Sequence, residues 1–265
     1  MTENLETLIV QVCKACKETA KFIHAEQARI KENNIEIKGL NNFVTYVDKE
    51  AEQKIVKYLT EILPDSGFIT EEGTIKTEKK EYTWIIDPLD GTTNFIHGLP
   101  CFCISVGLMH NNEIVLGVIY DPNLDECFQA FKDGGAYLND TKIRVSSAET
   151  LAESLLATGF PYYDYGKLDK YINLLSYFIK NTRGVRRFGS AAIDMAYVAC
   201  GRFSGFYEYG LNPWDVAAGA IIIQEAGGQV SDFAGKNNYI FGAELLASNG
   251  KIHKEFLRDV CRIFI

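Results

Sequence analysis

The sequence predicts a fold that mixes α+β and α/β organisation within 265 residues. Three observations lead to this prediction. Apolar residues recur at helical spacing before residue 64, and turns punctuate an antiparallel strand pattern over residues 103–138. After residue 146, short strands alternate with helices. We therefore expect an α+β half, residues 1–145, and an α/β half, residues 146–265, packed as one unit.

The first part of the chain predicts two helices separated by a loop. Residues 2–31 carry apolar side chains at helical spacing, as in a long amphipathic helix. The polar stretch at residues 31–42 predicts a loop. A second helix is expected over residues 47–63, and Pro64 marks its end.

Strands follow. Residues 84–86 are apolar and predict a short buried strand, and residues 103–138 predict a β-meander. Its turns are expected at residues 111–112, 121–123 and 134–135.

The second half predicts a layered α/β arrangement. Short strands are expected at residues 155–158, 185–188, 205–208, 229–231 and 245–247. Helices are expected at residues 167–180, 190–200, 213–225 and 251–261. No repeat, low-complexity tract or linker separates this half from the first.

Composition excludes several classes of protein. The net charge is −8 and no basic block is present, which argues against nucleic-acid binding and against docking on an anionic membrane. No apolar run approaches the roughly 18 residues of a membrane-spanning helix. The first ten residues lack a basic segment, so no signal peptide is expected. Seven scattered cysteines, an odd count, predict reduced thiols in a cytoplasmic protein.

The most informative segment, residues 84–94, runs from a strand into two carboxylates. Asp87 and Asp90 are three residues apart, and Gly91 and Thr92 follow directly. The carboxylates suit a hard divalent cation, and backbone N–H groups at a helix start suit a phosphate. The alternative is an ordinary turn followed by a helix N-cap.

Three further acidic sites are weaker on their own. Glu71, in a Glu-Glu-Gly sequence, is expected at a strand end, and taken alone this motif favours a solvated loop. Asp215 lies in the first turn of a buried helix, where the helix dipole stabilises a carboxylate without metal. Asp48 with Thr45 fits a capping box.

Other familiar sites are absent from the sequence. The stretch at residues 121–125 resembles the start of a calcium loop, but Glu126 and Lys132 occupy positions that should be Gly and Glu. The cysteine pairs lack the second pair of a zinc site. No nucleophile elbow, Walker A loop or dinucleotide fingerprint occurs. The chemistry therefore rests on carboxylates.

Two long motifs resemble those of the inositol monophosphatase family. Residues 87–94, Asp-Pro-Leu-Asp-Gly-Thr-Thr-Asn, are similar to the first family signature, and residues 214–219, Trp-Asp-Val-Ala-Ala-Gly, to the second. Shorter matches lie at residues 44–48, 71–73, 159–161 and 189–192. One departure is Thr70, which stands where many members have Gly. The resemblance covers nearly the whole chain.

The resemblance implies a fold, a cofactor and a set of roles. The fold is the layered αβαβα sandwich of the sugar-phosphatase superfamily, and two or three Mg²⁺ ions are the cofactors. The implied metal ligands are Glu71, Asp87, Asp90, Asp215 and the carbonyl oxygen of Leu89. Asp48 supports Thr92, which helps Glu71 to orient the attacking water. The implied substrate contacts are Gly91, Thr92, Gly189, Ser190, Ala191, Glu208 and Asp215.

The resemblance also implies an activity, the hydrolysis of a phosphate monoester such as inositol 1-phosphate or a similar polyol phosphate. Many members are homodimers and are inhibited by lithium. Other members act on fructose 1,6-bisphosphate, NADP, histidinol phosphate or adenosine 3′,5′-bisphosphate. Arg183, Arg186 and Arg187 could admit a second phosphate if any of them faces the cleft. A protein that keeps this fold but regulates through a binding partner is an alternative from another class.

Overall fold

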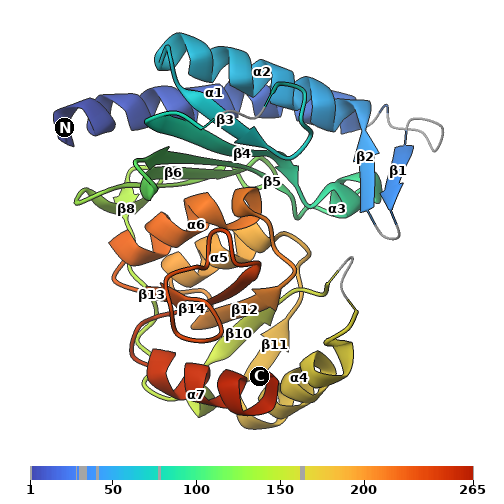
Figure 1. The fold of residues 1–265 in the computed structure, drawn as a ribbon, viewed down its shortest axis with the longest axis vertical. Coiled ribbons are helices and arrows are strands. Elements are labelled where there is room, and N and C mark those ends of the chain that lie inside the picture. The colour runs from blue at the N-terminus through green and yellow to red at the C-terminus, as the bar shows by residue number, and fades with distance from the viewer. Residues whose placement is uncertain are drawn as a thin grey trace.

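Five layers of helix and sheet stack in the order α–β–α–β–α (Figure 1). The computed structural model describes residues 2–27, 29, 35–39, 42–76, 79–161 and 165–264. This layering is the sandwich that the resemblance implied, and the mixed α and β fold class is confirmed.

The first two layers are a helix pair and a seven-stranded sheet. Helices α1 (Thr2–Gln27) and α2 (Tyr46–Ile62) cover one face of the sheet. Its strands, in spatial order, are β3 (Gly67–Thr70), β4 (Tyr82–Asp90), β5 (Cys103–His110), β6 (Glu113–Asp121), β7 (Glu126–Phe131), β8 (Gly135–Leu138) and β9 (Thr141–Lys142). Strand β3 is parallel to β4 and the other pairs are antiparallel, which confirms the predicted meander.

The central layer consists of α5 (Ala191–Ala199) and α6 (Pro213–Glu225), which lie between the two sheets. Helix α6 packs closely on β5 and β6 because two glycines pair across these strands, Gly107 opposite Gly117. A Cβ atom on Gly117 would lie 2.6 Å from the carbonyl oxygen of Ala218. The almost wholly apolar sequence of α6 therefore reflects burial on both sides.

The second sheet and the outer helices complete the stack. The five strands, in spatial order, are β11 (Gly184–Arg186), β10 (Leu155–Thr158), β12 (Gly205–Tyr209), β14 (Glu244–Ser248) and β13 (Gln229–Ser231). Strand β10 is parallel to β11 and β12, whereas β14 is antiparallel to both of its neighbours. A short 3-10 helix, Leu151–Glu153, precedes β10. Helices α4 (Leu168–Asn181) and α7 (His253–Phe264) cover the outer face.

One expected loop contains a strand. Within the polar stretch at residues 31–42, β1 (Ile35–Gly39) pairs antiparallel with β2 (Asn42–Thr45). The prediction of a continuous loop was therefore wrong over residues 35–39, where Ile35 and Ile37 alternate with polar residues. Asn42, also expected in the loop, begins β2. Residues 31–34, 40 and 41 lie outside the described residues, as does the end of the predicted first helix beyond residue 29.

Three smaller predictions can be compared with the structure. No helix in the described part of the chain is long and apolar enough to cross a membrane. All seven cysteines carry free thiols, and Cys16, Cys103 and Cys127 are buried. The residues that resembled a calcium loop form the turn between β6 and β7.

Candidate active site

Strand β4 delivers the two aspartates of the first signature. Its pairing with β5 shifts register between Asp87 and Asp90, so both side chains reach the end of the sheet. The backbone N–H of Leu89 donates to Asp87 Oδ1 at 2.9 Å. Gly91 then adopts φ +93° at the start of the short helix α3 (Thr92–Ile96), a conformation that favours glycine.

Glu71 lies beside Asp87 because β3 runs parallel to β4. Thr70, the last residue of β3, pairs with Ile86, and the N–H of Glu71 donates to the carbonyl of Ile86 at 3.2 Å. Burial, and next the charge of Glu71, raise the pKa of Asp87 well above its usual range. The adjacent strand ends thus bring two carboxylates together, and the charge of Glu71 disfavours the ionisation of Asp87.

Asp48 performs two structural tasks at the start of α2. Its Oδ2 accepts hydrogen bonds from the N–H and the hydroxyl of Thr45, at 2.8 and 2.6 Å, which confirms the predicted capping box. Its Oδ1 lies 2.8 Å from the hydroxyl of Thr92. The cap therefore ties α2 to the first turn of α3.

Asp215 reaches the same place from the second half of the chain. It occupies the first turn of α6, where its Oδ2 accepts the N–H of Asn212 at 2.6 Å. Burial, and next the charge of Asp90, raise the pKa of Asp215 to about 7. Removal from water thus outweighs the stabilisation that the helix terminus gives to the charged form.

Residues at the start of α5 hold Asp90 in place. The hydroxyl of Ser190 donates to Asp90 Oδ2 at 2.6 Å, and the N–H of Ala192 donates to the same atom at 2.8 Å. Burial still raises the pKa of Asp90 above its ordinary value, although these two bonds lower it. Asp90 therefore connects the two halves of the molecule.

One cavity collects almost every residue that the sequence singled out. The predicted site residues that line it are Glu71, Asp87, Leu89, Asp90, Gly91, Thr92, Gly189, Ser190, Ala191, Glu208 and Asp215. The remaining one, Asp48, lies behind Thr92 and contacts it directly.

The cavity also contains residues outside the predicted site. Among these are Gly159, which lies in one of the shorter family matches, Arg187, and Asp194, to which the sequence gave no role. Of the three arginines considered as a phosphate site, Arg187 lines the cavity. Asp194 is buried in α5, and its Oδ1 has no hydrogen-bond partner among the described residues. An acid within an otherwise apolar helix is the signal that marks Asp194 in the sequence.

Two further buried acids, Glu208 and Asp194, line the cavity together with Arg187. Burial, and next the charge of Asp215, raise the pKa of Glu208 well above its usual range. Burial, and next the charge of Glu208, do the same to Asp194. The positive charge of Arg187 opposes both shifts. Arg187 thus favours the ionised form of both acids, against the effect of their burial.

The donor set suits a hard divalent cation. Carboxylate and carbonyl oxygens are the ligands that Mg²⁺ prefers, and a cation would relieve the repulsion that raises the pKa of Asp87. Across the described residues, no group of three or more Asp, Glu, His or Cys side chains is already arranged to hold a metal ion. The residues therefore fit Mg²⁺ in chemistry and charge, and binding would have to bring their side chains into place.

Behind the cavity, Glu52 organises the segment that carries Glu71. Glu52 is fully buried in α2. Its carboxylate accepts four hydrogen bonds, from the hydroxyls of Thr70 and Thr74 and the N–H groups of Glu72 and Thr74, at 2.7 to 3.0 Å. Thr70, the departure from the family pattern, thus contributes one of the bonds that fix this loop.

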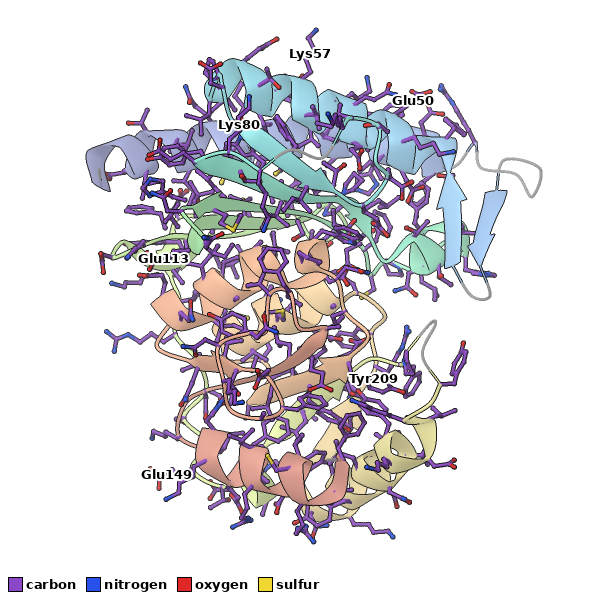
Figure 2. The ribbon with its side chains drawn as sticks, in the orientation of Figure 1. Glu50, Lys57, Lys80, Glu113, Glu149 and Tyr209 are labelled. Carbon is purple, nitrogen blue, oxygen red and sulfur yellow. The ribbon has the colours of Figure 1, made fainter. Side chains whose placement is uncertain are left out.

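We expect Glu52→Gln to loosen the Glu71 loop. The amide –NH₂ would face a donor, so the free energy of unfolding should fall by about 1–3 kcal/mol. The Mg²⁺ concentration needed for half-maximal activity should rise severalfold, because Glu71 would be less well placed. Glu50→Gln is the matched control, since Glu50 points to solvent from the same helix (Figure 2). An unchanged Mg²⁺ titration for Glu52→Gln would contradict this role.

The metal-free protein should lose stability as the pH rises. Asp215 has an ordinary pKa of 3.8 and a folded pKa of about 7, so the folded state holds the extra proton between these values. Its contribution to stability is present at low pH and is lost as the pH rises through 7. The pKa values of Asp87 and Asp90 are also raised in the folded state, so these two groups change the stability in the same direction.

Denaturant unfolding at pH 5 and pH 8 without metal tests this sign. The difference in unfolding free energy between the two pH values should be smaller in Asp215→Asn than in the wild type, by at least about 1 kcal/mol. Asp169→Asn, at an exposed position in α4, should retain the wild-type difference. The same pH dependence in Asp215→Asn and wild type would show that Asp215 does not carry it.

Comparisons with known proteins agree with this fold. Residues 4–263 match the Inositol monophosphatase family. The chain is 40% identical over 252 residues to a protein named Nus factor SuhB from Pseudomonas aeruginosa, covering 93% of each chain. It is 37% identical over 254 residues to a protein named inositol-1-monophosphatase from Mesorhizobium japonicum, covering 96% of each.

Solved structures show the same architecture. The structure of extragenic suppressor protein suhB from Bartonella henselae superposes with a TM-score of 0.91 at 36% identity, over 96% of this chain and 98% of that one. SaIMPase-II with inositol monophosphate bound gives a TM-score of 0.79 at 27% identity, over 96% of this chain and 94% of that one. The same protein with 2'AMP bound gives a TM-score of 0.81 at 27% identity, over 97% of this chain and 94% of that one. With matches of this extent in sequence and structure, the chain belongs to the inositol monophosphatase family.

Proposed function

We propose that this protein is a Mg²⁺-dependent phosphomonoesterase that hydrolyses inositol 1-phosphate or a similar polyol phosphate. The observation that carries the proposal is the convergence of Glu71, Asp87, Asp90 and Asp215 on one cavity. A cluster of carboxylates alone repels a phosphate dianion. The cluster can therefore bind a phosphate only when divalent cations reverse its negative charge.

Each residue has a proposed part in the reaction. Glu71, Asp87, Asp90, Asp215 and the Leu89 carbonyl would hold two or three Mg²⁺ ions. Bound there, Mg²⁺ would neutralise the phosphate, lower the pKa of water and stabilise the leaving oxygen. The backbone of Gly91 and Thr92 would hold the phosphate.

Thr92 and Asp48 would orient the attacking water together with Glu71. When the Thr92 hydroxyl donates its single proton to Asp48, its lone pairs are left to accept a hydrogen bond from water. Glu71 would accept the second proton of the water as the water oxygen attacks phosphorus opposite the leaving oxygen. That proton would then pass to the departing alkoxide, so that the products are the free alcohol and inorganic phosphate. Positioning and charge stabilisation supply the acceleration, and no covalent enzyme intermediate forms.

Charge favours a neutral polyol as the leaving group. Glu208 would accept hydrogen bonds from substrate hydroxyls, beside the wall formed by Gly189, Ser190 and Ala191. Arg187 faces the cavity, but it shares this region with Asp90, Asp194 and Glu208, and its charge acts on all three. A second phosphate there would meet three acidic side chains beside one arginine.

A substrate panel tests this choice. We expect Mg²⁺-dependent phosphate release to be fastest from inositol 1-phosphate, against fructose 1,6-bisphosphate, NADP, histidinol phosphate and adenosine 3′,5′-bisphosphate. A preference of tenfold or more for a bisphosphate would overturn the assignment of a polyol and retain the chemistry.

The two halves of the chain, residues 1–145 and 146–265, are proposed to act as one catalytic unit. Supporting this, Asp90 in the first half is bonded to Ser190 and Ala192 in the second. A cytoplasmic location is proposed from the free thiols. Homodimer formation and inhibition by lithium are proposed from family membership.

A second role through a protein partner is a separate candidate. It rests on relatives from Pseudomonas aeruginosa and Escherichia coli that are named Nus factor SuhB. The test is an Asp87→Asn variant expressed in place of the wild-type protein. Loss of hydrolysis with a preserved cellular phenotype would favour the partner, and loss of both would favour the enzyme.

A further inference from the structure

The carboxylate of Glu208 lies against the backbone of Gly159. An ideal Cβ atom built on Gly159 would lie 2.1 Å from Glu208 Cδ and 2.1 Å from each of its two carboxylate oxygens. Both residues line the cavity, and Glu208 is buried. The space that a side chain would occupy at position 159 is therefore filled by the Glu208 carboxylate.

Strand register explains why the two residues meet. Strands β10 and β12 are parallel, with Ala157 paired to Phe206 and Thr158 to Tyr207. The Thr158 hydroxyl donates to the Tyr207 carbonyl at 2.8 Å, which fixes this register at the strand end. Gly159 and Glu208 are the next residues along the two strands, so they lie side by side, and both line the cavity.

Glycine is required here for space and not for backbone freedom. The φ angle of Gly159 is not among the positive values found at other glycines of the chain. Alanine can therefore adopt the backbone conformation of Gly159. The Glu208 carboxylate would have to move by about 1.3 Å, from 2.1 Å to 3.4 Å, to reach ordinary van der Waals contact with the methyl group. A displacement of this size is large enough to disturb substrate positioning.

We propose that Gly159 is a specificity-determining residue that acts through Glu208: the missing side chain lets the Glu208 carboxylate occupy the place from which it binds the hydroxyls of the leaving group. This inference rests on the proposed function and adds a residue that selects the leaving group. Gly159 is a positioning residue, because it acts on the substrate through Glu208.

The test compares two substrates and Gly159→Ala. Inositol 1-phosphate offers hydroxyls to Glu208, whereas phenyl phosphate offers none on its leaving group. We expect Gly159→Ala to lower the ratio of kcat/KM for inositol 1-phosphate to kcat/KM for phenyl phosphate by about tenfold. The thermal midpoint should fall little, since alanine is compatible with the backbone at this position and its methyl group meets the end of the flexible Glu208 side chain.

A double-mutant cycle shows whether Glu208 transmits the effect. In a Glu208→Ala background the carboxylate is gone, so adding Gly159→Ala should change the substrate ratio less than twofold. An unchanged ratio in the single variant would overturn the inference. So would a tenfold loss that persists without Glu208, or an equal loss with both substrates. If the wild type hydrolysed neither substrate with Mg²⁺, the proposed function itself would fall.

Discussion

Asp90→Asn is expected to lower kcat for inositol 1-phosphate by about three orders of magnitude or more at saturating Mg²⁺. Asp90 Oδ2 accepts hydrogen bonds from Ser190 and Ala192, so an asparagine would direct its carbonyl oxygen to these donors. Its –NH₂ group would then face the cavity, where it can neither neutralise nor ligate a cation. The proposed metal site would lose one charged ligand while the surrounding backbone remains in place.

The stability of the same variant separates this effect from misfolding. Without metal, the charge of Asp90 opposes the ionisation of Asp87 and Asp215. The thermal midpoint of metal-free Asp90→Asn should therefore equal or exceed that of the wild type. Asp121→Asn is the control, because Asp121 is also buried and bonded to backbone but does not line the cavity. Its kcat should change less than tenfold. Near-normal Mg²⁺-dependent turnover in Asp90→Asn would contradict the metal assignment.

Thr92→Val is expected to lower kcat by about 10²–10⁴-fold. The hydroxyl of Thr92 lies 2.8 Å from Asp48 Oδ1 and 3.0 Å from the Leu89 carbonyl oxygen. Valine has the same shape but cannot accept a hydrogen bond from water or donate one to Asp48. The attacking water would lose one of its two protein partners, and KM should change less than kcat.

Thr92→Ser is the matched control for the hydroxyl. Serine restores the donor and acceptor, so its kcat should lie within about tenfold of the wild type. The measurement is kcat for the wild type, Thr92→Val and Thr92→Ser at the same Mg²⁺ concentration. Equal activity in Thr92→Val and wild type would show that the Thr92 hydroxyl does not orient the water.

The order of helices and strands was largely predictable because local signals agree with the tertiary structure. The predicted second helix, residues 47–63, corresponds to α2 at Tyr46–Ile62, and the predicted meander corresponds to β5 through β8. Strand β1 was missed because a five-residue strand in a polar stretch gives a weak periodic signal. Its pairing with β2 depends on tertiary context.

The candidate site was predictable where a motif is continuous in the sequence. One continuous motif of eight residues contains Asp87, Asp90, Gly91 and Thr92, and its strand, turn and helix start place these residues close together. Asp194 and Glu52 could not be assigned, and the sequence could not show which of three arginines faces the cavity, since these placements arise only when distant elements meet. Glu52, for example, is bonded to a loop about twenty residues further along the chain.

Phosphate release from inositol 1-phosphate by metal-free protein, measured before and after addition of Mg²⁺, tests the central claim most directly. We predict no measurable release above background before addition and sustained turnover afterwards. Chelation should abolish that turnover, and renewed Mg²⁺ should restore it. Equal rates with and without Mg²⁺, or no release in its presence, would contradict the assignment of the carboxylate cavity as a metal-dependent phosphatase site.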